Sequence, residues 1–334
     1  TNVKYQKLSK VVRLSPHNEK NDIVQNWLSR WHGIFLLAKK TSLLMSKYLI
    51  IRILGNDLES LHGGDQTYTN LEFTLKYEHD FPETDKIFIL NRIVDIEKKN
   101  RIISLLNKHN VKYEDIPFQK EEFNKLPKIN HISYSEIKSM DKNTLVGTLV
   151  DHNLYLVNNN GARNYALMYG KKNNYDWTFV LDSNSYFTYK SYNQIISNID
   201  NDSEYIVIPQ KRLKDGNLDN IMVCDESSID SLPDQEPQIA FKNTSKYMFN
   251  PDLPYGLAPK AEFLTALNVP GKWQNWMKFY GLNLQARKFT NVKYQKLSKV
   301  VRLSPHNENN DVKNNWLLRW YGIFLLAKNL QETI

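Results

Sequence analysis

The sequence contains little cysteine, little glycine and no long uninterrupted apolar run. Cys224 is the single cysteine among 334 residues, so an intrachain disulfide and a thiolate metal cage are excluded, and a reducing compartment fits. The apolar stretch from Ile34 to Leu54 is interrupted by three lysines and an arginine, which argues against a transmembrane helix. The N-terminus is polar and lacks the apolar core of a signal peptide. We therefore expect a soluble, cytoplasmic protein.

Long runs of one charge are also missing. The formal net charge is +8, but no five or six basic residues follow one another. This favours a solvated basic surface; a polyanionic partner such as nucleic acid, an acidic glycan or anionic lipid is the alternative. Hydrophobic residues make up 41% and aromatic residues 12% of the chain, which supports a substantial core and excludes a disordered chain. The length allows one large domain or two modest ones.

The two ends of the chain carry an internal repeat. Residues 1–39 recur as residues 290–328, with six differing pairs: Lys20/Asn309, Ile23/Val312, Val24/Lys313, Gln25/Asn314, Ser29/Leu318 and His32/Tyr321. The spacing is far too long for a solenoid repeat. It favours a tandem polypeptide, in which 1–41 is the tail of a preceding, very similar domain, 46–289 is the central domain, and 290–334 is the tail of that domain.

The repeated unit predicts an extended segment (294–303), a turn (304–307) and a helix (311–330). One helical face is apolar in both copies: Trp316, Trp320, Ile323, Phe324 and Ala327, and likewise Trp27, Trp31, Ile34, Phe35 and Ala38. Such amphipathic helices dock on an apolar surface. One domain normally offers one groove for one tail, so the first copy packs elsewhere, self-associates with a neighbouring molecule, or stays loosely attached.

Between the repeats, apolar runs alternate with helical patterns. Strands are predicted at 48–54, 86–90, 113–116, 177–181, 205–209 and 236–242, and helices at 66–78, 96–109, 159–169 and 259–267. Residues 119–150 have weaker periodicity and look like an insertion or lid, and 210–236 reads as a loop. This alternation predicts an α/β fold with a mainly parallel sheet.

The segment 158–184 is the most informative. A polar turn around Gly161 opens a helix, and the strand after that helix ends on Asp182. A carboxylate then lies at the carboxyl end of a buried strand beside a helix start, where open α/β sheets bind ligands. The arrangement suits a diphosphate held through a divalent cation.

These residues carry a family resemblance. The residues matching the Asn-x-Gly…Ala-Arg-Asn and Asp-x-Asp pattern are Asn158, Gly161, Ala162, Arg163, Asn164, Ala166, Leu167, Asp182 and Asn184. The central domain, about residues 47–289, resembles the GT-A fold of nucleotide-sugar glycosyltransferases, family 2-like, of a bacterial and viral subgroup. The segments 52–57, 62–67, 91–95 and 254–262 support the likeness. The resemblance implies a Rossmann-like, mainly parallel sheet flanked by helices, here with terminal amphipathic helices.

The resemblance also implies a divalent cation, Mn²⁺ or Mg²⁺, with Asp182 as its principal ligand and Asn184 as the second. Two positions depart from the family pattern: Asn184 replaces the second acid of Asp-x-Asp, and Asn91 replaces an aspartate common after the second strand. An asparagine can ligate a cation but contributes no charge. Metal dependence is therefore an open question.

The resemblance further implies nucleotide-sugar-binding residues. They are Arg52, Asn56, Asp57, His62, Gln66, Thr67, Asn91, Arg92, Asp95, Gly161, Arg163, Asn164 and Asp182. Turn and capping roles are the alternative for the Asn and Asp residues, and a structural ion pair is the alternative for Arg163. Arg52 within an apolar strand requires a partner.

Sugar transfer needs a base near the acceptor hydroxyl. The resemblance points to Glu262 as that base and gives Asp182 a catalytic role, with Asp252 and Glu236 as alternative bases. The expected function is transfer of a sugar from a nucleotide-diphosphate donor to a glycan or other hydroxyl acceptor, by inversion, with no nucleic-acid partner. Two rivals remain: a catalytically weak GT-A module that binds nucleotide or glycan, and a basic scaffold or nucleic-acid-binding protein.

Overall fold

The structure is a computed structural model that describes residues 23–44, 47–213, 229–275, 287–303 and 311–334. Cys224 and the predicted turn at 304–307 lie outside these ranges. The chain divides into two compact units, Thr1–Met45 and Ser46–Ile334. The first unit contains α1 (Ile23–Leu44). The three predicted domain boundaries stay a prediction.

The second unit is organised around one sheet. Within the described residues this sheet has nine strands, in the order β3-β2-β1-β4-β7-β6-β9-β5, with β8 paired to β6. Five of the eight strand pairings are parallel. The strands are β1 (Tyr48–Leu54), β2 (Thr84–Asn91), β3 (Lys112–Ile116), β4 (Trp177–Asp182), β5 (Ser185–Tyr186), β6 (Tyr205–Arg212), β7 (Asp234–Lys242), β8 (Tyr294–Lys296) and β9 (Val300–Arg302). The predicted α/β class with a mainly parallel sheet is confirmed.

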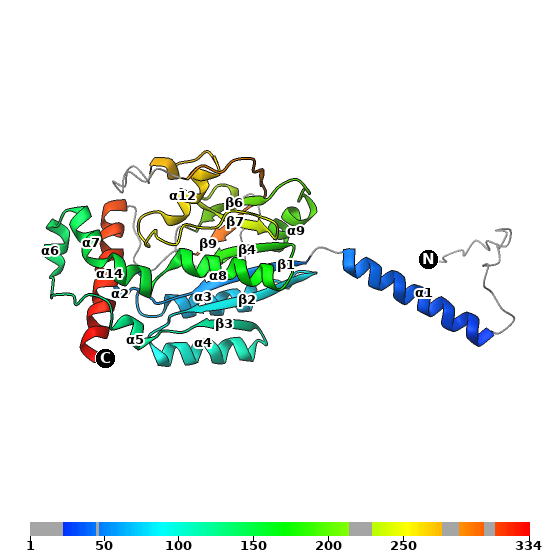
Figure 1. Cartoon of the computed structure of the whole chain (residues 1–334), viewed down its shortest axis with the longest axis horizontal. Coiled ribbons are helices and arrows are strands. Elements are labelled where there is room, and N and C mark those ends of the chain that lie inside the picture. Colours follow the sequence, from blue (N-terminus) through cyan, green and yellow to red (C-terminus); the bar gives the residue numbers. More distant parts are fainter. Residues whose placement is uncertain (1–22, 45–46, 214–228, 276–286, 304–310) are drawn as a thin grey trace. The chain divides into compact units, whose positions relative to one another are not determined.

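Helices cover both faces of the sheet (Figure 1). They are α2 (Glu59–His62), α3 (Gln66–Tyr77), α4 (Ile96–Lys108), α5 (Lys120–Phe123), α6 (Tyr134–Ser139), α7 (Lys142–Leu156), α8 (Asn159–Lys172), α9 (Tyr189–Ser197), α12 (Pro259–Ala266) and α14 (Val312–Thr333). Side chains of a strand alternate between the faces. Leu49 and Ile51 therefore join the core cluster of α8 and α12, whereas Ile50 joins that of α9 and Leu54 that of α3 and α4.

Every helix that the structure describes is too short or too polar to cross a bilayer.

The turn before α8 shows why the sequence needs a glycine there. Asn158 has a left-handed backbone (φ 38°), and its side chain caps the helix by accepting a hydrogen bond from the Gly161 amide. A Cβ on Gly161 would lie 2.2 Å from the Asn158 Oδ1. The glycine thus permits the tight cap, and the cap fixes the start of the helix that carries Arg163.

Residues 119–150, predicted to be an insertion or lid, form α5, α6 and most of α7. Leu145 and Leu149 of α7 are buried in a cluster with Trp320 and Phe324 of α14. Because the packing partner lies more than 160 residues away in the sequence, local periodicity gave little sign of this layer.

The C-terminal repeat completes the fold. β8 and β9 pair with β6, and α14 packs against α2, α6 and α7. The predicted apolar face of the helix is confirmed, because each of its members is buried: Trp316, Trp320, Ile323, Phe324 and Ala327. The segment predicted to be a tail is therefore part of the sheet and of the core.

Candidate functional site

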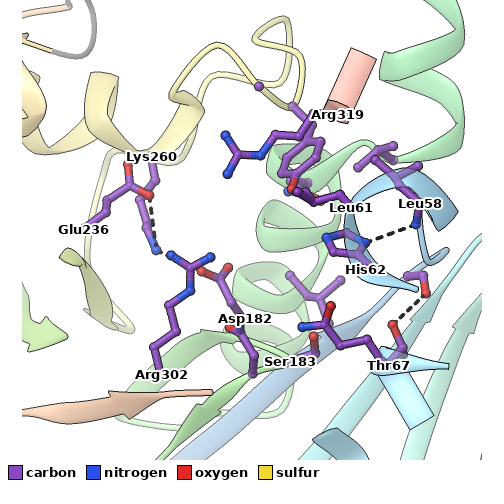
Figure 2. A pocket seen from close by; sticks show the side chains of 18 of the residues that line it. Leu58, Leu61, His62, Thr67, Asp182, Ser183, Glu236, Lys260, Arg302 and Arg319 are labelled. Carbon is purple, nitrogen blue, oxygen red and sulfur yellow. Dashed lines mark hydrogen bonds and ion pairs between the residues drawn. The ribbon is translucent and has the colours of Figure 1, made fainter. Parts of the chain in front are cut away.

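A cavity of about 430 Å³ lies at the carboxyl ends of the parallel strands. Asp182, the last residue of β4, is in register with Ile53 of β1, so the loops that follow these strands line one wall. Residues of β6, β7 and β9, the 255–260 segment and α14 line the rest. Figure 2 shows Asp182, Lys260, Arg302 and Arg319 directed into the same space.

Asp182 is the centre of a charged network. Its Oδ1 accepts a hydrogen bond from Arg163 Nη2 at 2.8 Å, and its Oδ2 accepts from Lys260 Nζ and from Gln238 Nε2, each at 3.0 Å. Burial by itself would raise the pKa of Asp182, but the charges of Lys260 and Arg163, with the hydrogen bonds from Gln238 and Arg163, hold that pKa well below its ordinary value. Asp182 is therefore a carboxylate held between two cations.

Lys260 connects Asp182 to a second carboxylate. Its Nζ lies 3.5 Å from Glu236 Oε2, and its side chain is almost fully buried. Within the described residues, Glu236 Oε1 is buried and has no hydrogen-bond partner. Lys260 lies in the first turn of α12, after Ala258, whose left-handed backbone (φ 51°) turns the chain into the helix.

The cavity carries an excess of positive charge. Its lining residues include five permanent cations, Arg163, Arg212, Lys260, Arg302 and Arg319, and three carboxylates, Asp57, Asp182 and Glu236. A cavity of this size is in the usual range for small-molecule sites, and its charge favours an anionic ligand.

On the β1 side, polar groups are already bonded to one another. Asp57 accepts hydrogen bonds from the Thr67 hydroxyl at 2.6 Å and from Lys98 Nζ at 3.0 Å. His62 Nδ1 accepts from the Leu58 amide at 3.1 Å, which fixes the ring orientation. Gln66 also lines the cavity, and its buried Oε1 has no hydrogen-bond partner among the described residues.

The cavity brings together eight of the predicted site residues: Asn56, Asp57, His62, Gln66, Thr67, Arg163, Asp182 and Asn184. Asn56 lines the cavity and also forms hydrogen bonds to the backbone of two neighbouring segments. Its Nδ2 donates to the Arg92 and Leu156 carbonyls, and its Oδ1 accepts from the Val94 amide.

Arg52 lies away from the cavity lining and has the partner that its burial requires. Arg52 Nη2 is 2.5 Å from Glu78 Oε1, and its Nε donates to the Ser185 carbonyl at 3.0 Å. The same Glu78 oxygen accepts from the Phe187 amide. The pair therefore anchors β5, directly after Asp182-Ser183-Asn184.

The remaining predicted binding residues lie outside the lining and have local contacts. Asn91 Nδ2 donates to the Val157 carbonyl, Arg92 lies over the Tyr155 ring, and Asp95 caps α4. Gly161 belongs to the cap of α8, and Asn164 exchanges two hydrogen bonds with the Phe249 backbone. These residues position loops around the cavity.

Glu262, the predicted base, is not brought to the cavity lining. It is buried, and its two carboxylate oxygens accept from Arg287 Nε and Nη2, each at 2.9 Å. It lies two residues after Lys260 in α12, but Lys260 lines the cavity and Glu262 does not. The alternative Asp252 is exposed and also lies outside the lining. The alternative Glu236 is the one of the three that lines the cavity.

The donor set around Asp182 does not fit a divalent cation in this arrangement. Both carboxylate oxygens accept hydrogen bonds from cationic side chains, and a metal ion would have to displace at least one. Asn184 Nδ2 donates to the Leu303 carbonyl. Within the described ranges, no three His, Cys, Asp or Glu residues are arranged to hold a metal ion. The cation at Asp182 and Asn184 stays a prediction.

Sequence reasoning assigned no role to Lys260, Arg302 or Arg319. Lys260 lies within a segment that supported the resemblance, but nothing in the sequence indicates that it contacts Asp182. Arg302 and Arg319 belong to the C-terminal repeat, and the first copy has arginine at both corresponding positions, Arg13 and Arg30. Because the two copies differ at only six positions, this shared pair was no signal of a role in the cavity.

No protein-family model and no curated protein matches the sequence. Solved structures that resemble the chain include S. aureus TarS 1–349 in complex with UDP, with 12% identity and a TM-score of 0.36 over 65% of this chain and 54% of TarS. Another is 4-diphosphocytidyl-2C-methyl-D-erythritol synthase, with 11% identity and a TM-score of 0.33 over 82% of this chain and 99% of that one. A third is the S. cerevisiae mannosyltransferase Ktr4p in complex with GDP, with 14% identity and a TM-score of 0.28 over 71% and 61%. This chain thus spans little more than half of the TarS structure. The fold assigned above rests on the chain's own strand order and pairing.

Proposed function

We propose that the cavity binds a nucleotide-diphosphate sugar and that the protein transfers the sugar to a hydroxyl acceptor. The observation that carries this proposal is the excess of cations in a cavity at the carboxyl edge of the parallel sheet. A diphosphate is a compact polyanion that such a cavity favours. Four residues that the family resemblance implied, Asp57, His62, Gln66 and Thr67, also line the cavity. In this proposal the nucleoside extends along them.

In this proposal Lys260 and Arg163 supply the positive charge for the diphosphate, and Asp182 holds both in position. The carboxylate keeps two buried cations stable until the ligand enters. Arg302 and Arg319, which are directed into the cavity, add further charge (Figure 2). Fixed cations of this kind stabilise the charge that develops on a leaving group.

Glu236 is the base in this proposal. The oxygen of the acceptor hydroxyl attacks the anomeric carbon, the bond from that carbon to the phosphate oxygen breaks, and the diphosphate leaves with the electron pair. Glu236, which lines the cavity, takes the hydroxyl proton. A single displacement of this kind inverts the anomeric configuration.

The test compares Glu236, which lines the cavity, with Glu262, which does not. Turnover is measured with UDP-, GDP- and dTDP-sugars for the wild type, Glu236→Gln and Glu262→Gln, and a CMP-sugar, which has no diphosphate, is included for comparison. We expect Glu236→Gln to lower turnover about 100-fold or more while donor binding persists. Glu262→Gln leaves Arg287 without its carboxylate, so it should reduce stability and spare turnover per folded molecule.

Full turnover by Glu236→Gln would remove that residue from the mechanism. Donor binding without turnover in the wild type would favour a catalytically weak nucleotide-binding module. Absence of binding to every nucleotide sugar would reject the proposed function.

A further inference from the structure

The groove that receives α14 is specific in shape. α14 packs against α2, α6 and α7, and the Ser60 hydroxyl of α2 donates to the Leu318 carbonyl at 2.7 Å. A Cβ on Gly322 would lie 2.7 Å from Ser60 Oγ and 2.8 Å from Leu58 Cβ. Only a glycine allows the helix to approach α2 this closely. The groove therefore fits a helix that has an apolar face and, beside it, a glycine where the helix contacts α2. We call this glycine position the glycine notch.

α1, in the other unit of the chain, carries the same features. Trp27, Trp31 and Ile34 are 57%, 55% and 55% exposed, although their counterparts Trp316, Trp320 and Ile323 are buried. The indole pair of α1 already has the docked geometry: the ring centroids are 6.0 Å apart in both helices, and the ring planes are inclined by 59° in α1 and 54° in α14. Trp27 and Trp31 of α1 are thus arranged like Trp316 and Trp320 of the docked helix.

Gly33 is the counterpart of Gly322. No atom would lie within 4 Å of a Cβ at Gly33, so nothing in the described structure requires a glycine there. Glycine in the middle of a helix weakens it relative to alanine. Gly33 therefore weakens α1 without a local benefit. Docking of α1 against a surface shaped like α2 would explain why a glycine is found there.

α14 also contributes Asn315 and Arg319 to the lining of the cavity. The corresponding residues of α1 are Asn26 and Arg30. The repeat therefore preserves the docking face, the glycine notch and the two polar residues that the helix delivers to the site.

We propose that α1 docks in the groove of α2, α6 and α7 on a second copy of this chain, in the place of α14, and delivers Asn26 and Arg30 to the cavity of that copy. The groove that α1 must fit is the one that already holds a helix of almost the same sequence. The docking stands without the proposed nucleotide chemistry, whereas the role given to Arg30 rests on it.

The differing residues make α1 the weaker of the two occupants. Tyr321 stacks on Phe324 and contacts Tyr134, and α1 has His32 at that position; Ser29 replaces Leu318. α14 is also tethered to its own groove, which raises its effective concentration there. Docking of α1 therefore requires that α14 leaves the groove. The docked fraction of α1 increases when α14 is bound less tightly.

Crosslinking between two full-length chains tests the exchange without any nucleotide. Both chains carry Cys224→Ser. The donor chain adds Ser29→Cys at the position of Leu318, and the acceptor chain adds Glu59→Cys, exposed beside Ser60. A short bismaleimide should join donor to acceptor, and Trp320→Ala in the acceptor, which loosens α14, should increase the yield.

Two donor variants separate docking from random collision. Gly33→Leu restores a better helix former but fills the notch, and it should lower the crosslinking rate about tenfold. Val24→Lys places on α1 the lysine that α14 carries at the exposed position 313, and it should leave the rate unchanged.

Equal rates for Gly33→Leu and Val24→Lys would overturn the proposal. So would the absence of crosslinking to a folded Trp320→Ala acceptor; should that acceptor not fold, Ile323→Val takes its place. Neither result would bear on nucleotide binding, which is measured separately.

Discussion

Asp182 combines roles that the sequence could not distinguish. Its two oxygens accept from Arg163, Lys260 and Gln238, so it organises the cations of the cavity. Loss of one member of a buried charge network leaves the others without compensation, and that penalty exceeds the value of the bond itself.

We predict that Asp182→Asn lowers the free energy of unfolding by about 2–3 kcal/mol at pH 7, because Arg163 and Lys260 lose their common counter-ion. The carboxylate pKa is about 4 in the unfolded chain and lower in the folded protein. The difference between wild type and variant should therefore be complete above about pH 4 and shrink as the pH falls through the folded pKa.

Denaturant unfolding of both proteins from pH 2.5 to 7 measures this difference. Asp115→Asn is the control, because Asp115 has one lysine partner, Lys99, in a more exposed pair. It should cost less than about 1 kcal/mol. Equal stability of wild type and Asp182→Asn at pH 7 would contradict the role given to this network.

Arg52 provides a second prediction for a single residue. Arg52→Met should cost about 2–4 kcal/mol, because buried Glu78 loses its closer cation and keeps only Lys86, whose Nζ lies 3.6 Å from its Oε2. Affinity for nucleotide per folded molecule should change little, since Arg52 lies outside the cavity lining.

Arg101→Met is the matched control, because the pair of Arg101 with Asp65 is largely exposed and should contribute far less to stability than the buried pair of Arg52. Unfolding and nucleotide titrations of both variants measure these effects. A large affinity loss in folded Arg52→Met would return this residue to the binding site that the family resemblance implied.

At the scale of elements, α14 belongs to the core and also contacts a loop that lines the cavity. Trp320 is fully buried, and its Nε1 lies 3.1 Å from the place where a Cβ on Gly256 would be. Gly256 has a backbone φ of 90°, which also favours glycine, and it lines the cavity four residues before Lys260. Packing of α14 therefore supports the loop that delivers Lys260.

We predict that Trp320→Ala costs about 3–5 kcal/mol and also weakens nucleotide binding, although Trp320 is not in the cavity lining. Trp27→Ala changes the same residue type in the exposed copy and should alter stability by about 0.5 kcal/mol or less. Thermal unfolding with and without nucleotide checks both variants. Similar effects of the two substitutions would contradict the assignment of α14 to the core of this unit.

At the scale of the whole molecule, the sequence predicted the strands of the parallel sheet well. β1 has the predicted ends, because a continuous apolar run marks a strand buried on both faces. For the helical layer of α7 and α14, the sequence predicted α14 but not α7. The two helices stabilise each other across a long sequence separation, and α7 alone shows little periodicity.

Where the family resemblance and strand order coincide, as at Asp182, Arg163 and Asp57, the residues named from the sequence line the cavity, and their functional roles stay predictions. The site was not predicted where the fold brings distant segments together. Lys260 reaches Asp182 across 78 residues, and Arg319 reaches the cavity from the last helix. Glu262 and Glu236 look equivalent in a sequence, and only the fold shows that one is paired with Arg287 and the other lines the cavity.

The central claim is that Lys260 and Arg163, held by Asp182, form a diphosphate site. Calorimetric titration of UDP, GDP, CDP and dTDP in excess EDTA tests it most directly, with the wild type, Lys260→Met and the control Lys99→Met, whose lysine lies outside the cavity lining. We predict that one diphosphate binds the wild type and Lys99→Met equally without a metal ion, and that Lys260→Met weakens binding about tenfold or more. Binding that requires Mn²⁺ or Mg²⁺, or that is unchanged in Lys260→Met, would contradict the claim.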